Sequence, residues 1–535
     1  MPDDQRDVIE FLGKPSSYGA AVERVEIIET HASIVFLAGD RAYKLKRAVK
    51  YSYLDFSTAE RRRVACEAEL HLNRRTAPEL YLEVRAVNRS APGELAFASA
   101  GPAVDWIVVM RRFDQELVFD ELAKAGRLSA SSMIELTGHI AAFHQSAEPR
   151  PGHGGAAALA AVVETNDGCL TAAREAGFSS ERIAEVRKSS LERLALVGAV
   201  LDRRRAEGKV RRCHGDLHLR NVCLLENRPT LFDCLEFSEE LASIDVLHDL
   251  AFLMMDLEHR GLTDFANLVL NRYLDLTGED DGLPAMPLFL SSRAAIRAHV
   301  SATTLARTTG SGPGSAMAAE ARRYLDQSAQ FLRPRPCRLV AIGGLSGTGK
   351  STLAASLAPS LSARVLRSDV IRKQLYGVAL ETRLPASAYA PQASHRVYET
   401  LRRRAKDALE AGYSVIVDAV SSEDPDESNL HNAIERLRNP SHVRMLPASE
   451  LDAGVSRAGF RNLEHATWDM DRELEEWLAI VADPARVEPI RTVVRALAES
   501  GRTAGFGLSM DRGQVVFFHR WRLIKARKPT STQRG

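Results

Sequence analysis

The sequence predicts two domains of different fold class: an α+β domain of two lobes, followed by an α/β domain with a parallel sheet. Its 535 residues exceed what a single hydrophobic core usually serves. Strand-like segments open the first half and helical patterns dominate the rest of it, whereas strands and helices alternate in the second half. The segment Arg333-Pro334-Arg335-Pro336 separates the halves, because alternating prolines end a helix and stiffen a linker.

The expected domain boundaries follow from this linker. We expect a first domain over residues 1–334, a second over residues 337–500, and a basic C-terminal extension over residues 501–535. A strand-like stretch, Gln514–Phe518, lies in the extension. Two roles stay open for this part of the chain, which would either complete the second domain or pack between the domains.

The composition is that of a folded protein with balanced charge. Hydrophobic residues make up 45% and charged residues 26%, which excludes disordered and fibrous chains. The 71 basic and 70 acidic side chains give a net charge of +1, so a dedicated nucleic-acid binder is not expected. The six cysteines include no CxxC pair and indicate neither a disulfide scaffold nor a zinc site.

The sequence carries no pattern of a targeting or membrane segment. The first residues are acidic and precede no long apolar run, which argues against a signal peptide. The most apolar stretch, Leu250–Met255, is far too short to cross a bilayer. We therefore expect a cytoplasmic protein without a membrane partner.

Strands and a helix are predicted in order at the start of the first domain. Ser33–Leu37 and Ala42–Leu45 have strand composition, with the turn residues Gly39-Asp40 between them. Ser57-Thr58-Ala59-Glu60 has the residue types of a capping box and predicts a helix start. Trp106–Met110 is the next expected strand, and long helical patterns follow it.

The richest segment of the chain includes the sequence HGDLHLRN. Asp216 and Asn221 are five positions apart, as in catalytic loops where the aspartate accepts a hydroxyl proton and the asparagine binds Mg²⁺. Asp233 lies twelve residues further on, after two short strands joined by the turn Glu226–Pro229. Such a hairpin would return Asp233 to the side of Asn221, where its carboxylate would also bind the metal.

Lys44 and Glu69 are the expected ion pair of the same site. A kinase-type site needs a strand lysine and a helix glutamate, because the pair positions two phosphates of the nucleotide. Ala42-Tyr43-Lys44 matches the usual end of that strand, although Lys46 points to the same face. At about 100° per residue, Glu69 lies near the inward stripe of its helix and Glu67 lies nearly opposite it.

These residues resemble the aminoglycoside phosphotransferase branch of the kinase-like superfamily. The likeness extends from about Thr30 to Met255, and HGDLHLRN and FDCLEF carry it most specifically. It implies a two-lobed, protein-kinase-like fold that uses ATP and Mg²⁺ to phosphorylate a hydroxyl of a small molecule. Asp216 would be the base. No glycine-rich loop precedes Lys44, so Ser33 and nearby backbone amides would have to serve the phosphates.

Five further acids of the first domain have weaker interpretations. By the resemblance, Asp245 and Asp249 would be buried structural acids of the family. Glu236, Glu239 and Glu240 would attract a cationic amine, although exposed acids are more often simply solvated.

The second domain begins with a P-loop pattern. Its strand Leu339–Ile342 leads into GxxxxGKS and then into a helix, so backbone N–H groups and a helix N-terminus would face the phosphates of a nucleotide. The candidate nucleotide-binding residues are Gly344, Gly347, Thr348, Gly349, Lys350, Ser351 and Thr352. Lys350 would reach the terminal phosphates, and the Ser351 hydroxyl would bind Mg²⁺.

Two acids and an arginine would decide what this domain does with a nucleotide. Asp369 follows the short strand Val365-Leu366, where it would either act as a base or cap the helix that it opens. Arg372, one turn later, would clamp a phosphate or another acidic group. Asp418 ends the buried strand that starts at Ser414 and would complete the Mg²⁺ shell.

The second domain resembles small-molecule P-loop kinases of the AAA-family, gluconate kinase and polynucleotide kinase type. The likeness covers about residues 337–460 and includes the P-loop, the SDVIRK segment and the strand ending in Asp418. It implies that Asp369 is a second catalytic base. Such kinases usually carry an arginine-rich lid, whereas the corresponding stretch here offers only Arg457 and Arg461. We therefore expect nucleotide binding, with turnover left open.

The combined patterns give one main hypothesis and two alternatives, and the whole chain is similar to a recurring bacterial fusion of these two domains. We expect an ATP-dependent phosphotransferase with a small-molecule hydroxyl acceptor and a second ATP site at the P-loop. Alternatively, the P-loop domain is a nucleotide-controlled ATPase or switch that gates a kinase-like binding module. A nucleic-acid end kinase also stays open because of the basic tail Arg520–Lys528, although the net charge disfavours a nucleic-acid partner. The sequence names no protein partner.

Overall fold

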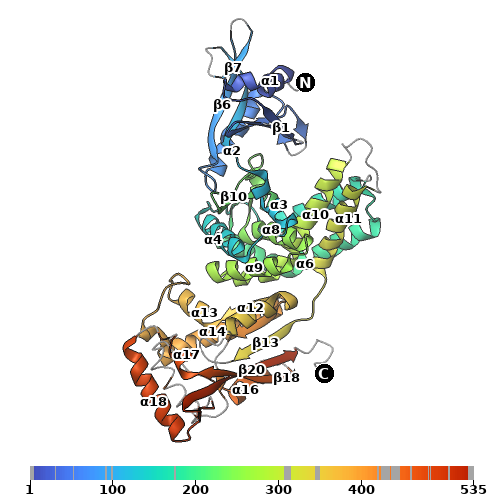
Figure 1. Ribbon diagram of the computed structural model, residues 1–535. Helices are drawn as coiled ribbons and strands as arrows, with labels where there is room; N and C mark the ends of the chain where they lie inside the picture. The colour runs from blue at the N-terminus through green and yellow to red at the C-terminus, as the bar shows by residue number, and fades with distance from the viewer. Residues whose placement is uncertain are drawn as a thin grey trace. The chain divides into compact units, whose positions relative to one another are not determined.

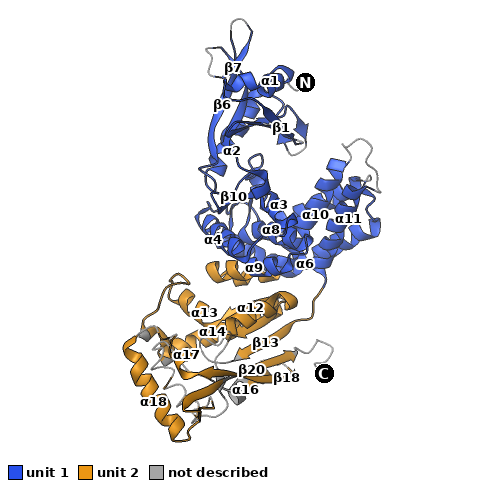
Figure 2. Cartoon of the chain, viewed as in Figure 1, with its two compact units in different colours: residues 1–269, 285–333 blue, residues 270–284, 334–535 orange. Residues whose placement is uncertain are grey.

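The computed structural model forms two compact units (Figure 1). The first unit contains residues 1–269 and 285–333, and the second contains residues 270–284 and 334–535 (Figure 2). The structure describes residues 5–30, 32–51, 54–90, 93–97, 101–173, 176–305, 315–343, 350–418, 421–422, 434, 446–457, 461–479, 481, 484–503 and 507–527. Within these ranges, we find no helix with the length and apolar character that a bilayer crossing requires.

The first unit opens with a six-stranded antiparallel sheet in the order β1-β2-β3-β8-β6-β7. Its strands are β1 (Val25–Glu29), β2 (Ser33–Ala38), β3 (Arg41–Lys46), β6 (Tyr81–Arg89), β7 (Leu95–Phe97) and β8 (Ala103–Arg111). Helix α1 (Arg6–Gly13) adds Val8 and Leu12 to the core on one face, around Phe36. Helix α2 (Ala59–Asn73) packs on β6 and β8. A short hairpin, β4 (Lys50–Tyr51) and β5 (Leu54–Asp55), precedes α2.

Helix α2 begins differently from the sequence expectation. Thr58 is its N-cap and accepts the Arg61 N–H at 3.3 Å. Ser57 instead donates its hydroxyl to Asp55 Oδ1 at 2.6 Å. The capping box expected from Ser57 and Glu60 therefore does not form, because the nearer carboxylate of Asp55 engages the serine.

Helices make up most of the rest of the first unit. They are α3 (Phe119–Lys124), α4 (Ala130–Ser146), α5 (Gly155–Ala172), α6 (Ser180–Ala206), α7 (Glu239–Ala242), α8 (Val246–His259), α10 (Met286–Leu305) and α11 (Ala316–Leu332). Strands β9 (Val210–Arg212) and β12 (Ser243–Asp245) pair with each other. Helix α8 is buried from Val246 to Leu257 and packs on α10, which packs on α11. This helical bulk after the sheet agrees with the two-lobed α+β expectation.

A hairpin connects the two motifs that carry the acids of the first unit. Strand β10 (Val222–Leu225) pairs with β11 (Arg228–Leu231). Glu226 and Asn227 both have positive φ, as the two-residue turns that suit a twisted hairpin require. The turn is shorter than expected, since residues 228 and 229 belong to β11. The chain returns as predicted, and the Phe232 N–H donates to the Asn221 carbonyl at 3.0 Å.

The second unit contains a sheet in the order β14-β15-β13-β20-β18. Its strands are β13 (Arg338–Gly343), β14 (Ala363–Arg367), β15 (Ser414–Asp418), β18 (Arg461–Glu473) and β20 (Gln514–Arg527). The expectation of a parallel sheet holds only for β13, β14 and β15. Strand β20 is antiparallel to β13, and β18 is antiparallel to β20. Helices also lie between β18 and β20 in the chain, so strand–helix alternation does not by itself determine the direction of strand pairing.

Helices α12 (Lys350–Leu361) and α17 (Leu474–Leu478) pack against strands of this sheet. The remaining elements are α13 (Ser368–Leu375), α14 (Pro391–Glu410), β16 (Ser421–Ser422), β17 (Leu446–Pro447), α16 (Ala448–Arg457), α18 (Val487–Glu499) and β19 (Ser509–Asp511). Helix α12 packs on β14 and β15, and Trp477 of α17 packs on Phe517 of β20. The C-terminal strand thus completes the second unit, which answers the question that the sequence left open.

The second unit also includes a segment from the middle of the chain, residues 270–284. Helix α9 (Thr263–Thr277) begins in the first unit and ends in the second. Arg364 of β14 is only 1% exposed and donates to Asp275 at 2.6 Å and to Asp280 at 2.7 Å. Asn271 accepts the Val365 N–H at 2.7 Å. Residues 270–284 are therefore built into the edge of the P-loop sheet by buried polar contacts.

Candidate active site

Asp216 lies in a loop whose shape its neighbours fix. Gly215 has a φ of +84°, and a Cβ there would lie 2.9 Å from the Cβ of Leu235, so the position requires glycine. The Asn221 amide donates to both the carbonyl and Oδ2 of Asp216 at 2.9 Å. His218 Nε2 lies 3.4 Å from the same Oδ2. Two side chains of the loop therefore orient the Asp216 carboxylate.

The charges around Asp216 keep its carboxyl ionised. Burial raises the pKa of this carboxyl, but His218, Arg297 and His214 act against burial, and the resulting pKa lies below the ordinary value of an aspartate. A group that accepts a proton must be unprotonated at the working pH. Asp216 therefore has the protonation state of a general base.

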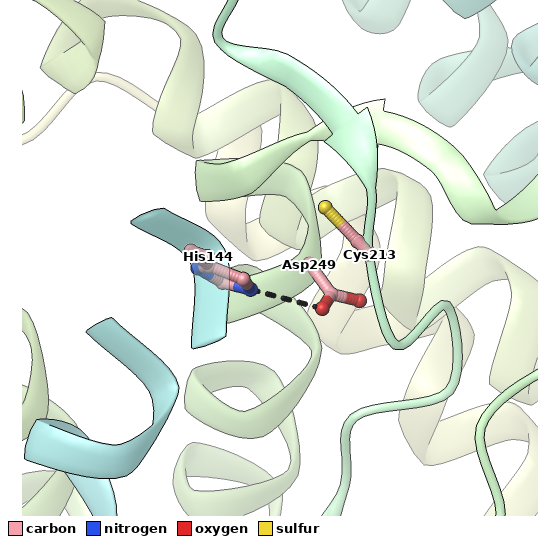
Figure 3. A group of neighbouring side chains, drawn as sticks. All are labelled: His144, Cys213 and Asp249. Carbon is pink, nitrogen blue, oxygen red and sulfur yellow. Dashed lines mark hydrogen bonds and ion pairs between the residues drawn. The ribbon is translucent and has the colours of Figure 1, made fainter. Parts of the chain in front are cut away.

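A second aspartate, Asp249 of α8, holds the backbone of this loop. Its oxygens accept the N–H groups of His214 and Gly215 at 3.1 and 2.9 Å. His144 Nε2 lies 3.1 Å from Oδ2, and Figure 3 shows this contact with Cys213 beside it. Opposing charges overcome the effect of burial and lower the Asp249 pKa to about 2. The resemblance implied a buried structural acid at this position, and the contacts fit that role.

His144, Cys213 and Asp249 are close enough together to hold a metal ion, but their donor atoms are already engaged. The thiol of Cys213 donates to the Ile244 carbonyl at 3.4 Å, and Asp249 accepts two backbone N–H groups. Burial raises the pKa of the Cys213 thiol well above its ordinary value, whereas a metal-bound cysteine is a thiolate. We interpret this group as a support of the loop that carries Asp216.

Both ends of α8 carry further aspartates that hold the loop region. Asp245 caps α8 and makes two bonds, of 2.8 and 2.9 Å, to the buried guanidinium of Arg204. Asp256 accepts the Leu219 N–H at 3.1 Å. Position 219 opens the single 3-10 turn between Asp216 and Asn221, so the spacing of the two polar side chains is anchored from α8.

An alternating chain of charges joins the sheet to this loop. Lys44 Nζ lies 2.8 Å from Glu69 Oε1 and 2.6 Å from Asp233 Oδ1. Burial lowers the pKa of Lys44, but the two carboxylates raise it well above the ordinary value. Glu69 is fully buried, whereas Glu67 is exposed and pairs with Arg63 on the outer face of α2. The geometry is the one expected of Lys44 and Glu69.

Lys46 takes part in the same chain, a feature that the sequence pattern left undecided. Its side chain is 1% exposed and bonds to Glu69 Oε2 at 2.6 Å and to Glu236. Lys44 and Lys46 therefore share one carboxylate, from the same face of β3. Of the two, Lys44 is the more exposed and is the one in contact with Asp233.

Asn221 and Asp233 offer oxygen atoms that fit a magnesium ion. Asn221 uses its amide N–H group for Asp216, which leaves its Oδ1 oxygen available as a metal ligand. Asp233 has a φ of +62°, its N–H donates to the Tyr81 hydroxyl at 3.1 Å, and its side chain is 40% exposed. Mg²⁺ prefers hard oxygen ligands and keeps several waters, so a carboxylate and an amide oxygen are ligand types that suit it.

Ser33 has a less informative environment. It begins β2, opposite Lys46 on β3. Its N–H donates to the Thr30 hydroxyl at 3.0 Å, and its carbonyl accepts from the same hydroxyl. The turn is thus closed by its own side chains, and the expected phosphate contact of Ser33 stays a prediction.

The described part of the P-loop site joins a hydroxyl to a carboxylate. Gly344, Gly347, Thr348 and Gly349 lie outside the described residues. Helix α12 starts at the buried Lys350. Ser351 Oγ donates to Asp418 Oδ2 at 2.8 Å, and Thr352 is exposed. A serine hydroxyl beside a carboxylate at the end of β15 is the oxygen pair that P-loop enzymes use for Mg²⁺.

Asp369 and Arg372 of α13 are both engaged within their own unit. The cap of α13 is Arg367, so Asp369 does not cap the helix, and its exposed carboxylate pairs with Lys373 at 3.0 Å. Arg372 is buried, donates to the Ala388 carbonyl at 2.6 Å and lies 4.6 Å from the Tyr389 ring centroid. Among the described residues, neither side chain forms a hydrogen bond or ion pair with Ser351 or Asp418.

Comparison with known proteins assigns both halves of the chain. Residues 51–288 match the phosphotransferase enzyme family, and residues 339–452 match an AAA domain. The uncharacterized protein Rv2004c of Mycobacterium tuberculosis is 31% identical over 450 residues, which cover 81% of this chain and 86% of that protein. The chain belongs to the same family as Rv2004c. It joins a kinase-like phosphotransferase domain to a P-loop kinase-like domain.

Other matches are more distant. The uncharacterized methyltransferase YcgJ of Bacillus subtilis is 27% identical over 132 residues, 24% of this chain and 52% of that protein. Choline kinase from Cryptosporidium parvum superposes with a TM-score of 0.39 at 11% identity, covering 61% of this chain and 95% of that one. A putative aminoglycoside phosphotransferase from Ralstonia eutropha gives 0.36 at 12% identity, with 62% and 98% covered. At these TM-scores the likeness carries no argument about substrate.

Sequence reasoning missed several residues that shape the site. Asp256 stands seven positions after Asp249, hence on the same face of α8, a spacing that would have marked it. Arg293 donates to the Gly215 carbonyl at 3.3 Å, and Arg297 follows one turn later on α10. Two arginines at this spacing in an alanine- and serine-rich helix were a readable signal of an inward polar face.

Proposed function

We propose that the chain is an ATP-dependent phosphotransferase that transfers the γ-phosphate to a hydroxyl of a small molecule. One observation carries the proposal: Asp216, held by Asn221, lies in the unit that also joins Lys44 to both Glu69 and Asp233. This set supplies a base, a phosphate-binding cation and metal-binding oxygens, which together are what phosphoryl transfer requires.

Each residue of the set has a distinct role in the proposed reaction. Lys44, held by Glu69, binds phosphate oxygens of ATP. Asn221 and Asp233 would hold Mg²⁺, which when bound offsets the negative charge of the phosphates. Asp216 orients the acceptor hydroxyl and takes its proton as the hydroxyl oxygen attacks the γ-phosphorus.

The P-loop unit is proposed to bind a second ATP through Lys350, with Ser351 and Asp418 as the residues that would hold its Mg²⁺. Asp369 remains the candidate base of this unit, with Arg372 as a phosphate clamp. A nucleotide-controlled switch is the alternative role. The contacts favour it, because Asp369 pairs with Lys373 and Arg372 is buried against the Ala388 carbonyl.

The test is transfer of labelled γ-phosphate from Mg-ATP into a mixture of small hydroxyl compounds. Loss of product in Asp216→Asn, with wild-type stability, is the expected result. The pair Glu69→Gln and Glu67→Gln gives a matched control on one helix, since only Glu69 contacts Lys44. Product that persists in Asp216→Asn contradicts the proposed base.

A third variant separates the two units. If Lys350→Met retains the organic product, the first unit performs the transfer and the P-loop acts as a switch or a separate site. Product lost only in Lys350→Met moves the chemistry to the second unit. Release of free phosphate without an organic product, if it depends on Lys350, contradicts the phosphotransferase proposal and supports an ATPase.

A further inference from the structure

Two of the three acids that the sequence offered for a cationic acceptor, Glu236 and Glu239, are occupied by arginine and lysine. Glu236 bonds to the buried Lys46. Glu239 pairs with Arg150 at 2.9 Å and lies 3.5 Å from Arg212. A site for an amino sugar or an amino alcohol needs carboxylates that are free to pair with ammonium groups, and these two are not free.

Asp256, the acid of α8 that lies beyond the catalytic loop, is engaged as well. One of its oxygens accepts the Leu219 N–H at 3.1 Å, and the other lies 3.3 Å from Arg260 Nε. Asp256 is buried. Apart from Asp216 itself and the exposed Glu240, these contacts leave no carboxylate of this group to bind an ammonium ion.

A cation is present beside the base instead. Arg293 of α10 donates to the carbonyl of Gly215, next to Asp216, and Arg297 is one turn further on the same helix face. Arg297 is partly exposed. Within the described ranges, no carboxylate forms an ion pair with the Arg297 guanidinium.

Aromatic side chains hold Arg297 in place. Its guanidinium carbon lies 5.7 Å from the ring centroid of Tyr324, which is 1% exposed. His259 stacks on the Tyr324 ring, at 3.6 Å between centroids and 10° between planes, and its Nδ1 lies 3.0 Å from Gln327 Oε1. A guanidinium held against a fixed ring loses little entropy when it binds an anion.

We propose that the acceptor is a hydroxyl compound that carries an oxyanion, either a carboxylate or a phosphate, and that Arg297 binds this group while Asp216 faces the hydroxyl. This inference rests on the proposed function and names its substrate class. The hydroxyl proton passes to the Asp216 carboxylate, and the hydroxyl oxygen bonds to the γ-phosphorus. The bond from that phosphorus to the β–γ bridging oxygen breaks, and ADP leaves.

The first experiment asks which class of compound takes the phosphate. A deproteinised bacterial extract is separated at neutral pH into anionic, neutral and cationic fractions, and each is incubated with the full-length protein and Mg-ATP labelled at the γ-phosphate. Label that depends on Asp216 should enter the anionic fraction. Treating this fraction beforehand with alkaline phosphatase distinguishes the two oxyanions, because only phosphomonoester acceptors are lost.

The second experiment uses the acceptor purified from the labelled fraction. Arg297→Gln should raise its KM by about ten- to hundredfold with a smaller change in kcat, since it removes a charge-assisted contact. Arg297→Lys keeps the charge and should recover part of the loss. Arg187→Gln is the control, because this exposed arginine of α6 pairs with Glu164.

Three results overturn the proposal. The first is label that enters the cationic or the neutral fraction in an Asp216-dependent way, which leaves the proposed function standing. The second is an unchanged KM for the anionic acceptor in Arg297→Gln. The third is no Asp216-dependent label in any fraction, which removes the proposed function and this inference together. If Arg297→Gln fails to fold, Arg297→Lys and the fractionation still decide the question.

Discussion

Replacing Lys46 by methionine tests whether the alternating charges stabilise the first unit as a connected group. The buried side chain of Lys46 bonds to Glu69 and Glu236. The group consists of two lysines, Lys44 and Lys46, and three carboxylates, those of Glu69, Asp233 and Glu236. Its formal charge is therefore −1, and it becomes −2 in Lys46→Met. Asp233 is partly exposed and stays solvated, but Glu236 loses the only lysine to which it is bonded among the described contacts.

The expected cost follows from burial. Removing one partner of a buried ion pair typically costs about 3–5 kcal/mol, because the remaining charge is left uncompensated. We expect the lower end, about 3 kcal/mol, since Lys44 stays beside Glu69 and methionine refills most of the volume. In Lys46→Met/Glu236→Gln the uncompensated carboxylate is gone, so the double variant should recover at least about 1 kcal/mol relative to Lys46→Met.

Native-state hydrogen exchange read by peptide is the suitable assay, because it reports the opening free energy of β3 and α2 separately from that of the second unit. Lys44→Met is the matched comparison: it should cost less stability, since Lys44 is the more exposed lysine, and abolish more of the activity. A coupling between positions 46 and 236 below about 0.5 kcal/mol would refute the reasoning, because independent charges give additive effects.

Three further predictions concern pH and the second unit. Because the pKa of its carboxyl is held below the ordinary value, Asp216 should stay ionised down to about pH 5. The pH profile of kcat/KM should therefore show no acidic limb from this residue between about pH 5 and 8. An acidic limb near about pH 6 that disappears when Asp216 is replaced would contradict this prediction. Asp249→Asn should be less stable than wild type at neutral pH, and the difference in unfolding free energy should shrink as the pH falls from about 4 to about 2. The reason is that a carboxyl with a lowered pKa in the folded state contributes stability that is lost on protonation. An unchanged difference over this pH range, measured by urea titration, would contradict the prediction. Arg364→Met should destabilise the second unit by about 3 kcal/mol, the lower end for a buried pair, because Asp275 and Asp280 lose their buried partner and keep Arg367 and Arg404. Arg272→Met, at a surface pair with Glu381, should cost no more than about 1 kcal/mol when both variants are compared by thermal unfolding.

Local spacing was enough to predict the parts of the site that lie on one supersecondary unit. The interval between Asp216 and Asn221, and the hairpin that leads to Asp233, are both contained in about twenty residues, so period and turn chemistry determine them. Helical phase also distinguished Glu69 from Glu67, because the two differ by 200° around α2 at about 100° per residue. Predictions of this kind need no knowledge of the rest of the fold.

The features that the sequence did not yield depend on contacts between distant segments. Strand β20 pairs with β13 across more than a hundred and seventy residues, and no local pattern announces the antiparallel direction of that pair. The insertion of residues 270–284 into the second unit rests on Arg364 meeting Asp275 and Asp280, none of which belongs to a motif. Such pairings are decided by tertiary packing, for which one sequence carries no periodic signal.

The charge chain of the first unit also bears on how a nucleotide would enter. Lys44 contacts both Glu69 and Asp233, so two carboxylates orient its ammonium group. A phosphate that takes the place of the Asp233 carboxylate exchanges one ion pair for another instead of burying a new charge, and it frees Asp233 for a metal ion. Meanwhile Lys46 keeps Glu69 in place from the other side. In the proposed function, the second lysine would let the first change partners without releasing α2, so the phosphate site would be preorganised and would not need a swing of the helix.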